Sequence, residues 1–498
     1  MTTSFRRPRA LLLALLALAG CTAVQQELSR RPRPDIPELY RESVNNDDRN
    51  PVILVLGMGG SVLSRQSDGK IVWGELFSDD VLDISSPVGL RALVLDLWQL
   101  PRHIDQRQLA TLQDDVVATR PLGRLRADAL VTDVELNVYA SLLALLGAHG
   151  YTEDDPESPV YDQSTTSCFI FAYDWRLDNV ANAQALGRFI ARARLRVEEQ
   201  RRQHGLPARQ VRFDVVAHSM GGLIARYYLR YGSRDVLDAP ESAAITWEGA
   251  RDIDRLVLVA PPNFGSMVML QRLVTGRRLA PLLPKVEPVM LASMVSPYQM
   301  LPRPGTRWLV NAAGLPVDLD LLSAKTWEAN DWGPFAADQD PYLQWIFPSE
   351  PDRQGRRQRL MAFMDAALER GRRFATALDR RPERPCPAVL TLFAGDARPT
   401  LQRALVAPKG TKLELLFEGP PELELTAPGD GRVTRASALA DLRSLGAPGP
   451  WLRSPIPWSH AMFINDSHLG LTKNPNFQNN LLHQLLELPP PARSPALP

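Results

Sequence analysis

Cysteine is scarce in this sequence, whose 498 residues include 3 cysteines, and histidine is also rare, with 7 residues. So few cysteines exclude a scaffold that is held together by many disulfides. The histidines and cysteines do not gather at the spacings of metal ligands, and no dinucleotide-binding fingerprint follows an expected strand. The sequence therefore predicts a protein that uses neither a metal nor an organic cofactor.

An excess of charge of one sign is also missing. The chain has 57 basic and 56 acidic residues, a net charge of +1, and the two signs are interspersed apart from an N-terminal group of arginines. This balance gives no indication of a nucleic-acid surface. The composition, 45% hydrophobic and 23% charged, instead suits a large globular protein with a substantial core.

The apolar run near the N-terminus is too short to cross a bilayer, which takes about 20 residues. This run, Ala10–Ala19, follows Arg6, Arg7 and Arg9. A basic group followed by a short apolar run is the pattern of a signal peptide rather than of a membrane span.

The end of this run resembles the bacterial lipobox, in which a cysteine is lipidated and becomes the new N-terminus: it reads Leu18-Ala19-Gly20-Cys21. We expect residues 1–20 to be a lipoprotein signal peptide, Cys21 to carry the lipid, and residues 21–49 to form a polar tether. Because Thr22 rather than aspartate follows the cysteine, the pattern predicts an outer-membrane lipoprotein of a bacterial cell envelope, facing the periplasm or the surface. An ordinary secretory signal with an incidental cysteine is the alternative.

Six short runs of β-branched and aromatic residues predict strands. Several are apolar throughout rather than alternating, which is typical of strands that are covered on both faces, as in a parallel sheet. Helical patterns lie between most of them, and this alternation predicts a doubly wound α/β fold. The expected strands are Pro51–Leu56, Cys168–Tyr173, Val211–Val216, Ile253–Ala260, Ala388–Ala394 and Ala461–Ile464, and the main expected helices are Ala181–His204, Gly222–Tyr231 and Asn479–Leu488.

Two stretches, residues 74–160 and 267–385, are too long to be structureless loops in a compact domain. We interpret both as inserted subdomains, and the second as a cap or lid. The predicted core therefore has two parts, residues 50–266 and 386–488, and a disordered tail, residues 489–498, follows it.

A serine stands where an apolar strand ends and two glycines begin, in the sequence D-V-V-A-H-S-M-G-G that contains Ser219. A strand that turns sharply into a helix at this point lifts the hydroxyl above the carboxyl edge of the sheet, as in the nucleophile elbow G-x-S-x-G. Ala217 replaces the first glycine and is small enough for the turn. The pattern predicts a nucleophilic serine, and an incidental serine in a strand-to-helix turn is the alternative.

A serine hydroxyl is a poor nucleophile until a base takes its proton. His468 lies just after the last expected strand, in the loop from which an α/β hydrolase brings its base to the serine. His460, at the start of that strand, is the alternative. His218 neighbours the serine in sequence but is expected to point away from it.

The base needs a carboxylate that fixes its tautomer, and two aspartates compete for this role. Asp396 directly follows the strand Leu390–Ala394, which is the usual position of the acid. Asp430 comes later, in a turn with a glycine on each side. Position alone does not decide between them.

The negative charge that develops on the substrate oxygen needs hydrogen-bond donors. One expected donor is the backbone N–H of Met220, directly after the nucleophile. The other is the backbone N–H of Met58, in the glycine-rich turn after the first strand. A phosphate loop is the alternative interpretation of these glycines, but no Lys-Ser/Thr pair follows them.

Together these motifs resemble the lecithin:cholesterol acyltransferase family, which includes lysosomal phospholipase A2 and phospholipid:diacylglycerol acyltransferases. The resemblance runs as islands from about Asn50 to Leu486 and implies an α/β-hydrolase fold with inserted cap or lid subdomains. The matching stretches are P-V-I-L-V-L-G from Pro51, Y-D-W-R from Tyr173, V-A-H-S-M-G-G from Val216, A-P-P-N-F-G-S from Ala260, S-P-Y-Q-M-L-P from Ser296, F-A-G-D-A-R-P-T from Phe393 and G-D-G-R-V from Gly429.

The resemblance implies that the acid is Asp430 rather than Asp396, because Asp430 falls on the acid residue of the family's motif. Arg432 departs from that motif, which usually has threonine at this position. Asp174 and Arg176, within the Y-D-W-R stretch, are expected to form a structural ion pair or to anchor the cap.

The implied catalytic triad is Ser219, Asp430 and His468, and the implied oxyanion hole consists of Met58 and Met220. We therefore expect a serine acyl hydrolase or O-acyltransferase that acts on lipid esters through an acyl-serine intermediate. Its expected partners are a lipid ester substrate and the membrane that holds its anchor. An esterase for soluble esters and a non-catalytic surface lipoprotein on a hydrolase scaffold are the alternatives.

The implied fold also bears on the two remaining cysteines. The strand of Cys168 lies roughly four strands from the one after Cys386, about 19 Å away at about 4.8 Å per strand. A disulfide needs Cα atoms within about 7 Å, so we expect no bridge between them.

Two apolar features allow two interpretations each. The stretch Val88–Leu100 is expected either to touch lipid or to pack as an ordinary helix of the first insertion. Tryptophans of the second insertion are expected either to line an acyl groove or to form the core of the cap; they are Trp308, Trp327, Trp332 and Trp345.

Overall fold

A computed structural model of the chain describes residues 36–40, 42–43, 49–75, 80–122, 138–157, 167–278, 284–303 and 308–491. The predicted signal peptide, Cys21 and residues 492–498 of the predicted tail lie outside the described residues. The chain divides into a unit of residues 1–45, in which α2 (Ile36–Leu39) is described, and a unit of residues 46–498. The features that follow belong to the second unit.

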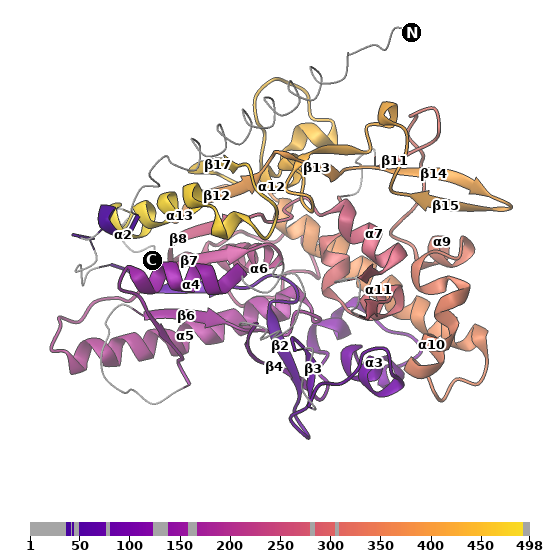
Figure 1. The fold of residues 1–498 in the computed structure, drawn as a ribbon, viewed down its shortest axis with the longest axis horizontal. Coiled ribbons are helices and arrows are strands. Elements are labelled where there is room, and N and C mark those ends of the chain that lie inside the picture. Colours follow the sequence, from indigo (N-terminus) through magenta and orange to yellow (C-terminus); the bar gives the residue numbers. More distant parts are fainter. Residues whose placement is uncertain are drawn as a thin grey trace, which may run out of the picture. The chain divides into compact units, whose positions relative to one another are not determined.

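A seven-stranded parallel sheet forms the centre of this unit (Figure 1). All six predicted strands are present, and every pairing in the sheet is parallel, so the predicted α/β-hydrolase fold class is confirmed. In spatial order the strands are β17 (His460–Ile464), β12 (Val389–Gly395), β8 (Ile253–Val259), β7 (Phe213–His218), β1 (Val52–Val55), β6 (Ser167–Phe171) and β5 (Thr152–Asp154).

The edge strand β5 lies within the stretch predicted as the first insertion. It pairs with β6, and therefore the last part of residues 74–160 belongs to the central sheet. Its apolar signal is weak because two of its three residues are exposed and carry polar side chains, Thr152 and Glu153.

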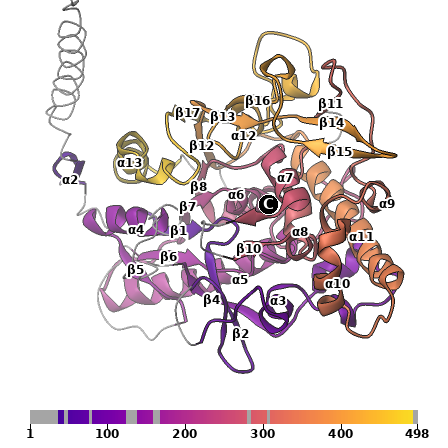
Figure 2. The same ribbon diagram turned by 45° about the vertical axis from the view of Figure 1, so that its right-hand side comes forward.

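Helices cover both faces of the sheet, which explains the uninterrupted apolar runs. All residues of β1, β7 and β8 are buried. The helices α4 (Val138–Ala148) and α13 (Pro475–Leu482) lie on one face, and α5 (Asn179–Gln203) and α6 (Met220–Tyr231) lie on the other (Figures 1 and 2).

A small antiparallel sheet joins the first insertion to the residues that precede it, in the order β3 (Ile71–Trp73), β2 (Ser61–Arg65) and β4 (Val116–Pro121), of which β4 alone lies within residues 74–160. The helix α3 (Pro87–Leu93) lies between β3 and β4 in the chain. Within Val88–Leu100 the described leucines at 90, 93, 95 and 97 are buried, whereas Val88 is 57% exposed. This stretch therefore packs as an ordinary part of the core.

The second insertion consists mostly of helices and is drawn at the right of Figure 1. Trp308, Trp327 and Trp332 are buried, and Trp345 is partly buried against the core. They pack in the core of the cap, and none of them lines the cavity beside Ser219. The principal helices are α7 (Met267–Thr275), α8 (Pro288–Ala292), α9 (Ala324–Ala329), α10 (Asp340–Ile346) and α11 (Arg353–Asp379).

An excursion of the chain separates β12 from the last strand, β17. It begins with β13 (Arg398–Leu401) and returns through β16 (Thr426–Gly429), which pairs antiparallel with β13. Between them the hairpin of β14 (Ala404–Lys409) and β15 (Lys412–Leu416) joins β11 (Leu309–Val310) of the second insertion. The predicted cap and the second part of the predicted core thus both contribute strands to this small sheet.

Arg176 connects the core to both insertions and is fully buried. Its guanidinium lies 2.8 Å from Asp114 and 2.7 Å from Asp174, and it donates to the carbonyl of Leu93 at 3.2 Å. Its own carbonyl accepts from the N–H of Val295 at 2.9 Å. The predicted structural ion pair with Asp174 is present, and Arg176 also anchors the beginning of the cap.

The thiols of Cys168 and Cys386 are both free. Cys168 lies in β6, and Cys386 precedes β12, which stands four strands away in the sheet. Among the described residues, no helix has the length and apolarity that a membrane crossing requires.

Candidate active site

Ser219 occupies a strained turn between β7 and α6. Its backbone has φ 54° and ψ −125°, a conformation that a residue with a side chain adopts rarely. The N–H of Ser219 donates to the carbonyl of Val259 on the neighbouring strand at 2.8 Å, which holds the turn at the end of the sheet. This is the geometry that the elbow motif predicts.

Gly221 lets α6 begin directly against the first strand. A Cβ atom at this position would lie 2.3 Å from the carbonyl oxygen of Leu56 and 2.7 Å from that of Val55. Only glycine fits so close an approach of backbone to backbone. The glycine of the motif is therefore a packing requirement of the turn that presents Ser219.

His468 joins the serine to a carboxylate. It lies in the loop after β17; its Nε2 is 2.9 Å from Ser219 Oγ, and its Nδ1 is 2.9 Å from Asp430 Oδ2. Because a carboxylate accepts the hydrogen bond, Nδ1 carries the proton and Nε2 is left to accept the proton of the serine hydroxyl. The structure thus brings together three residues that lie far apart in the sequence.

Asp430 is held by hydrogen bonds on both carboxylate oxygens. Besides His468, its Oδ1 accepts from the backbone N–H groups of Arg432 and Val433, each at 2.8 Å. Its carbonyl accepts from the N–H of His468 at 2.9 Å. Both Asp430 and His468 are almost fully buried, at 2% and 4% exposure, so the pair is shielded from water.

The surroundings keep this pair in the state that a base requires. Burial raises the pKa of Asp430, but the hydrogen bonds and charge of His468 and the backbone donors outweigh it, so that the pKa falls below its usual value. Burial lowers the pKa of His468, Asp430 opposes this, and the charges of Arg432 and Arg272 lower it further. His468 is consequently neutral near pH 7.

The two rival residues lie elsewhere. Asp396 is partly exposed and lies 4.0 Å from the guanidinium of Arg435. His460 begins β17 with an exposed side chain. Asp430 and His468 are therefore the acid and imidazole that the fold places beside Ser219, although Asp396 has the simpler position at the end of β12.

Met58 and Met220, the residues expected to donate to the oxyanion, both lie near Ser219. Met58 follows the end of β1 and lines the cavity beside Ser219, and Met220 is the first residue of α6. The turn that carries Met58 is closed by a bond from the N–H of Gly60 to the carbonyl of Gly57 at 3.0 Å. Met58 thus lies in a turn that is closed by a hydrogen bond, and Met220 lies at the start of a helix.

A buried chain of hydrogen bonds, which we call the Tyr139 relay, links this turn to His468. The N–H of Gly57 donates to Tyr139 Oη at 2.7 Å, and the hydroxyl proton of Tyr139 points to His218 Nδ1 at 3.1 Å. His218 Nε2 then donates to the carbonyl of His468 at 3.2 Å. Burial, followed by the charge of His468, lowers the pKa of His218 to about 3, so this ring is neutral.

The motifs did not indicate the Tyr139 relay. His218 was expected only to point away from the serine, and Tyr139 lies 79 residues before it in the sequence. No spacing rule connects a tyrosine at the start of one helix to a histidine at the end of a distant strand.

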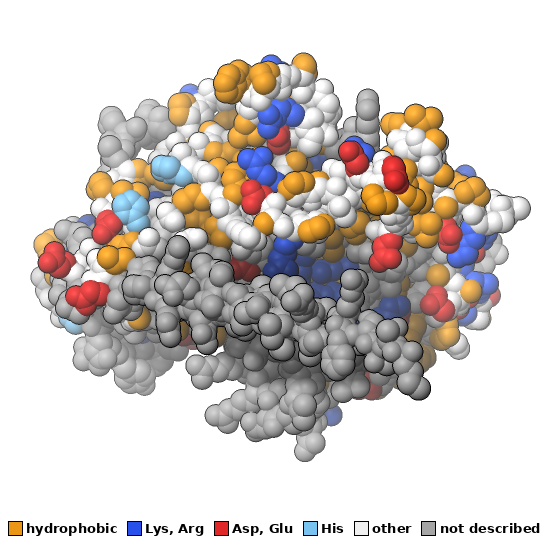
Figure 3. Space-filling view, turned by 45° about the horizontal axis from the view of Figure 1, so that its top comes forward, with side chains coloured by type: hydrophobic (Ala, Val, Ile, Leu, Met, Phe, Trp, Pro, Cys, Tyr) orange, Lys and Arg blue, Asp and Glu red, His pale blue; other side chains and the backbone are white. Residues whose placement is uncertain are grey.

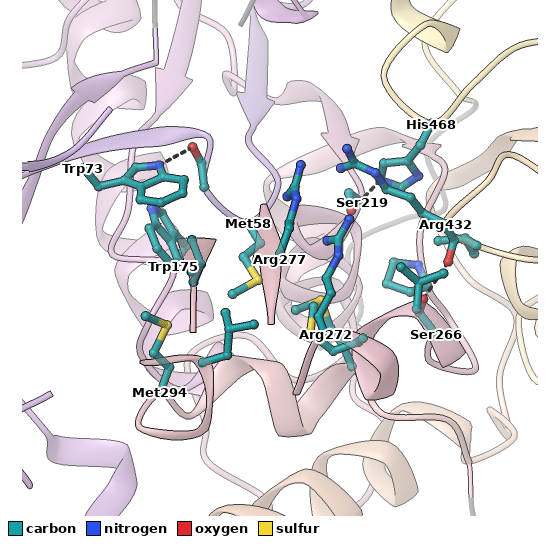
Figure 4. A pocket seen from close by; sticks show the side chains of 18 of the residues that line it. Met58, Trp73, Trp175, Ser219, Ser266, Arg272, Arg277, Met294, Arg432 and His468 are labelled. Atoms are coloured by element: carbon teal, nitrogen blue, oxygen red, sulfur yellow. Dashed lines mark hydrogen bonds between the residues drawn. The ribbon is translucent and has the colours of Figure 1, made fainter. Parts of the chain in front are cut away.

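A cavity opens beside Ser219 and His468 (Figure 4). One side is apolar and carries Trp73 and Trp175, whose rings meet edge to face at 5.2 Å. The indole N–H of Trp73 donates to the carbonyl of Gly59 at 3.1 Å, which fixes the ring against the turn that follows β1. The other described lining residues are mostly apolar, including Met58, Met269, Leu291, Met294 and Met300, together with Arg272, Arg277 and Arg432.

The described ranges contain no group of histidine, cysteine, aspartate or glutamate side chains placed to hold a metal ion. Ser219, His468 and Asp430 instead supply a hydroxyl, an imidazole and a carboxylate. This set can transfer a proton from the alcohol and back without a metal.

Comparisons with known proteins match this chain to one family. The model for the family described as "Lecithin:cholesterol acyltransferase" matches residues 120–327, which include Ser219, so the resemblance is confirmed over that part of the chain. No curated protein matches the chain. Among solved structures it is similar to "The crystal structure of Tle4-Tli4 complex", with 17% identity, 88% of this chain and 98% of that chain covered, and a TM-score of 0.48. A similarity this distant carries no information about activity.

Proposed function

We propose that this chain, whose residues 120–327 match the lecithin:cholesterol acyltransferase family, is a serine acyl hydrolase or O-acyltransferase of lipid esters. The observation that carries the proposal is the continuous path Ser219–His468–Asp430, with 2.9 Å at each step, at the wall of a largely apolar cavity. An inert scaffold gains nothing from a serine in a strained turn beside a neutral imidazole.

In the first half of the reaction Ser219 Oγ attacks the ester carbonyl while His468 Nε2 takes its proton. The carbonyl oxygen becomes an oxyanion and receives hydrogen bonds from the N–H groups of Met58 and Met220. Asp430 stabilises the imidazolium that forms. As the tetrahedral intermediate collapses, His468 returns the proton to the leaving alcohol, and an acyl-serine remains.

In the second half His468 takes a proton from water or from an acceptor alcohol, and the resulting oxygen nucleophile attacks the acyl-serine. The products are a fatty acid or a new ester, and Ser219 regains its proton from His468. The same groups serve both outcomes, so the choice between hydrolysis and transfer depends on which nucleophile reaches the acyl-serine.

The lining of the cavity supports a substrate with a long acyl chain. Trp73, Trp175 and Met294 offer apolar surface on the side of the cavity away from the arginines (Figure 4), and Met300 also lines the cavity. Methionine side chains adapt to the shape of a flexible chain, and buried aromatic rings contribute large apolar area. A site for small soluble esters would not need so extended an apolar wall.

We further propose that the N-terminal segment attaches the enzyme to a bacterial outer membrane through Cys21. Growth of an expressing bacterium with labelled palmitate tests this: the chain should take up the label, and a Cys21→Ala variant should not. Equal labelling of both chains would refute the anchor and leave the proposed reaction untouched.

Reaction with a fluorophosphonate probe tests the catalytic serine. We expect the wild-type chain to be labelled and a Ser219→Ala variant to remain unlabelled, because the probe reacts with activated serines. A Ser266→Ala variant, which removes the other serine among the described residues of the cavity, should still be labelled.

Incubation with labelled phospholipid, with and without a fatty alcohol or sterol, then tests the substrate. Release of fatty acid or formation of a new ester that depends on Ser219 is the expected result. Labelling without either product would favour an esterase of soluble substrates, and no labelling at all would favour a non-catalytic surface protein.

A further inference from the structure

Three arginines from three separate elements line the cavity beside Ser219. Arg272 lies on α7, Arg277 begins β9 (Arg277–Arg278), and Arg432 follows the acid Asp430 by two residues. Figure 4 shows the ends of their side chains directed toward Ser219 and His468. Among the described residues that line the cavity there is no aspartate or glutamate.

The arginines act on one another through their charges. Burial and, to a lesser extent, the charge of Arg432 together lower the pKa of Arg272 to about 9. The same causes, in the same order, lower the pKa of Arg277 to about 9. Burial also lowers the pKa of Arg432, although the negative charge of Asp430 opposes this shift. All three remain protonated near pH 7, so the fold concentrates positive charge where it is partly shielded from water.

Bringing three positive charges together costs electrostatic free energy, and a bound anion lowers this cost. Like charges near one another destabilise the site, whereas an anion placed among them gains charge-assisted hydrogen bonds from planar guanidinium groups. The lecithin:cholesterol acyltransferase family usually has threonine at the position of Arg432. The positive charge of Arg432 is therefore a feature of this chain and is not required by the catalytic triad.

The cavity thus has two chemically different sides around one nucleophile. Trp73, Trp175 and Met294 lie on the apolar side, the three arginines lie on the cationic side, and Met58 lies between them (Figure 4). On the face that Figure 3 draws, basic side chains also gather in the recessed middle. A lipid ester whose acyl chain contacts the apolar side would carry its headgroup toward the cationic side.

We propose that Arg272, Arg277 and Arg432 form a headgroup subsite that selects lipid esters with a net negative headgroup over zwitterionic ones. The proposal rests on the proposed function, because it concerns the substrate of the same serine. A phosphodiester without a counter-charge binds the three guanidinium groups. A headgroup that adds a quaternary ammonium brings a like charge to the same place and is disfavoured.

Short-chain phospholipids test this with a matched pair of substrates. Dihexanoyl phosphatidylglycerol and dihexanoyl phosphatidylcholine share acyl chains, ester bonds and phosphate, and differ in net charge. Both are used below the concentration at which they aggregate, so that no lipid surface is present. We expect the wild-type kcat/KM for phosphatidylglycerol to exceed that for phosphatidylcholine by about 10- to 100-fold.

An Arg272→Gln/Arg277→Gln double variant should reduce this ratio to within about threefold, because it removes two of the three charges that discriminate. An Arg277→Gln single variant should give an intermediate ratio and serves if the double variant does not fold. The control is Arg278→Gln, which changes an exposed neighbour that does not line the cavity and should preserve the wild-type ratio.

Two outcomes would overturn the inference. One is a wild-type enzyme that turns over both monomeric lipids equally, or whose ratio survives the arginine substitutions. The other is a preference for phosphatidylglycerol that exists with vesicles but is absent with monomers, because the arginines would then act through a membrane surface. In both cases turnover that depends on Ser219 would leave the proposed function intact, whereas loss of all turnover and of probe labelling would refute the function itself.

Discussion

His218 makes the stability of this protein depend on pH in a way that can be isolated. It is almost fully buried within the Tyr139 relay, and its pKa falls from 6.5 to about 3. Below pH 6.5 the unfolded chain binds a proton on this ring that the folded chain does not bind. The contribution of His218 to the free energy of unfolding is therefore fully present well above pH 6.5 and is lost as the pH falls toward the pKa of the folded state.

The magnitude follows from the size of the shift. Each pH unit between the two pKa values costs about 1.4 kcal/mol, so that lowering the pH from 7.5 to 4.5 removes about 2.7 kcal/mol through this one ring. Other groups titrate over the same range, and the comparison must therefore be made against a variant that lacks only this proton. A His218→Asn variant keeps an oxygen that can accept from Tyr139 and has no group that titrates.

Denaturant unfolding of the wild-type chain and the His218→Asn variant, at half-unit intervals from pH 7.5 to 4.5, gives the required difference. At pH 7.5 we expect the wild type to be more stable, because the variant loses the bond to the carbonyl of His468. That advantage should shrink by about 1.4 kcal/mol per unit below pH 6.5. A difference that does not change with pH would refute the assignment of a neutral, buried His218.

Two further predictions concern the turn and the base. A Gly221→Ala variant should lose about 1–3 kcal/mol of unfolding free energy and most of its esterase activity, because the added methyl would lie 2.3 Å from the carbonyl oxygen of Leu56. Thermal unfolding measures the loss of stability. The control is Gly147→Ala, whose added methyl would lie in open space on α4 and should not destabilise the protein. The kcat/KM should rise with pH through a pKa below 6.5, where His468 loses its proton, and then stay level; a kcat/KM that still rises above pH 7 would contradict this role of His468. An Asp430→Asn variant should have a kcat lower by about 10³–10⁴, and an unchanged kcat would contradict the role of Asp430.

The elements that the sequence predicted best are those whose physical cause is local. β1, β7 and β8 are buried on both faces, so that each reads as an unbroken apolar run. The elbow at Ser219 needs a small residue before the serine and glycines after it, and all of them lie within nine consecutive residues. Met58 lies in a turn that its neighbouring glycines predict.

Other parts of the site depend on contacts that no local pattern encodes. The choice of Asp430 over Asp396 came from the family resemblance, because the excursion through β13 and β16 separates Asp430 from β12 in the sequence, although it returns this residue to the end of that strand. No sequence motif distinguishes Arg272 and Arg277 from other arginines of the second insertion. Only the folding of that insertion brings their charges into the cavity beside Ser219.

The pairing of β13 with β16 closes the base of the excursion just before Asp430. Four residue pairs, from Arg398 with Gly429 to Leu401 with Thr426, form this seam, and Thr400 Oγ1 accepts from the N–H of Gly431 at 2.8 Å. These contacts hold the turn of Asp430 independently of the residues between β13 and β16. We therefore expect changes of length or sequence in the hairpin of β14 and β15 to leave the position of the carboxylate unaltered.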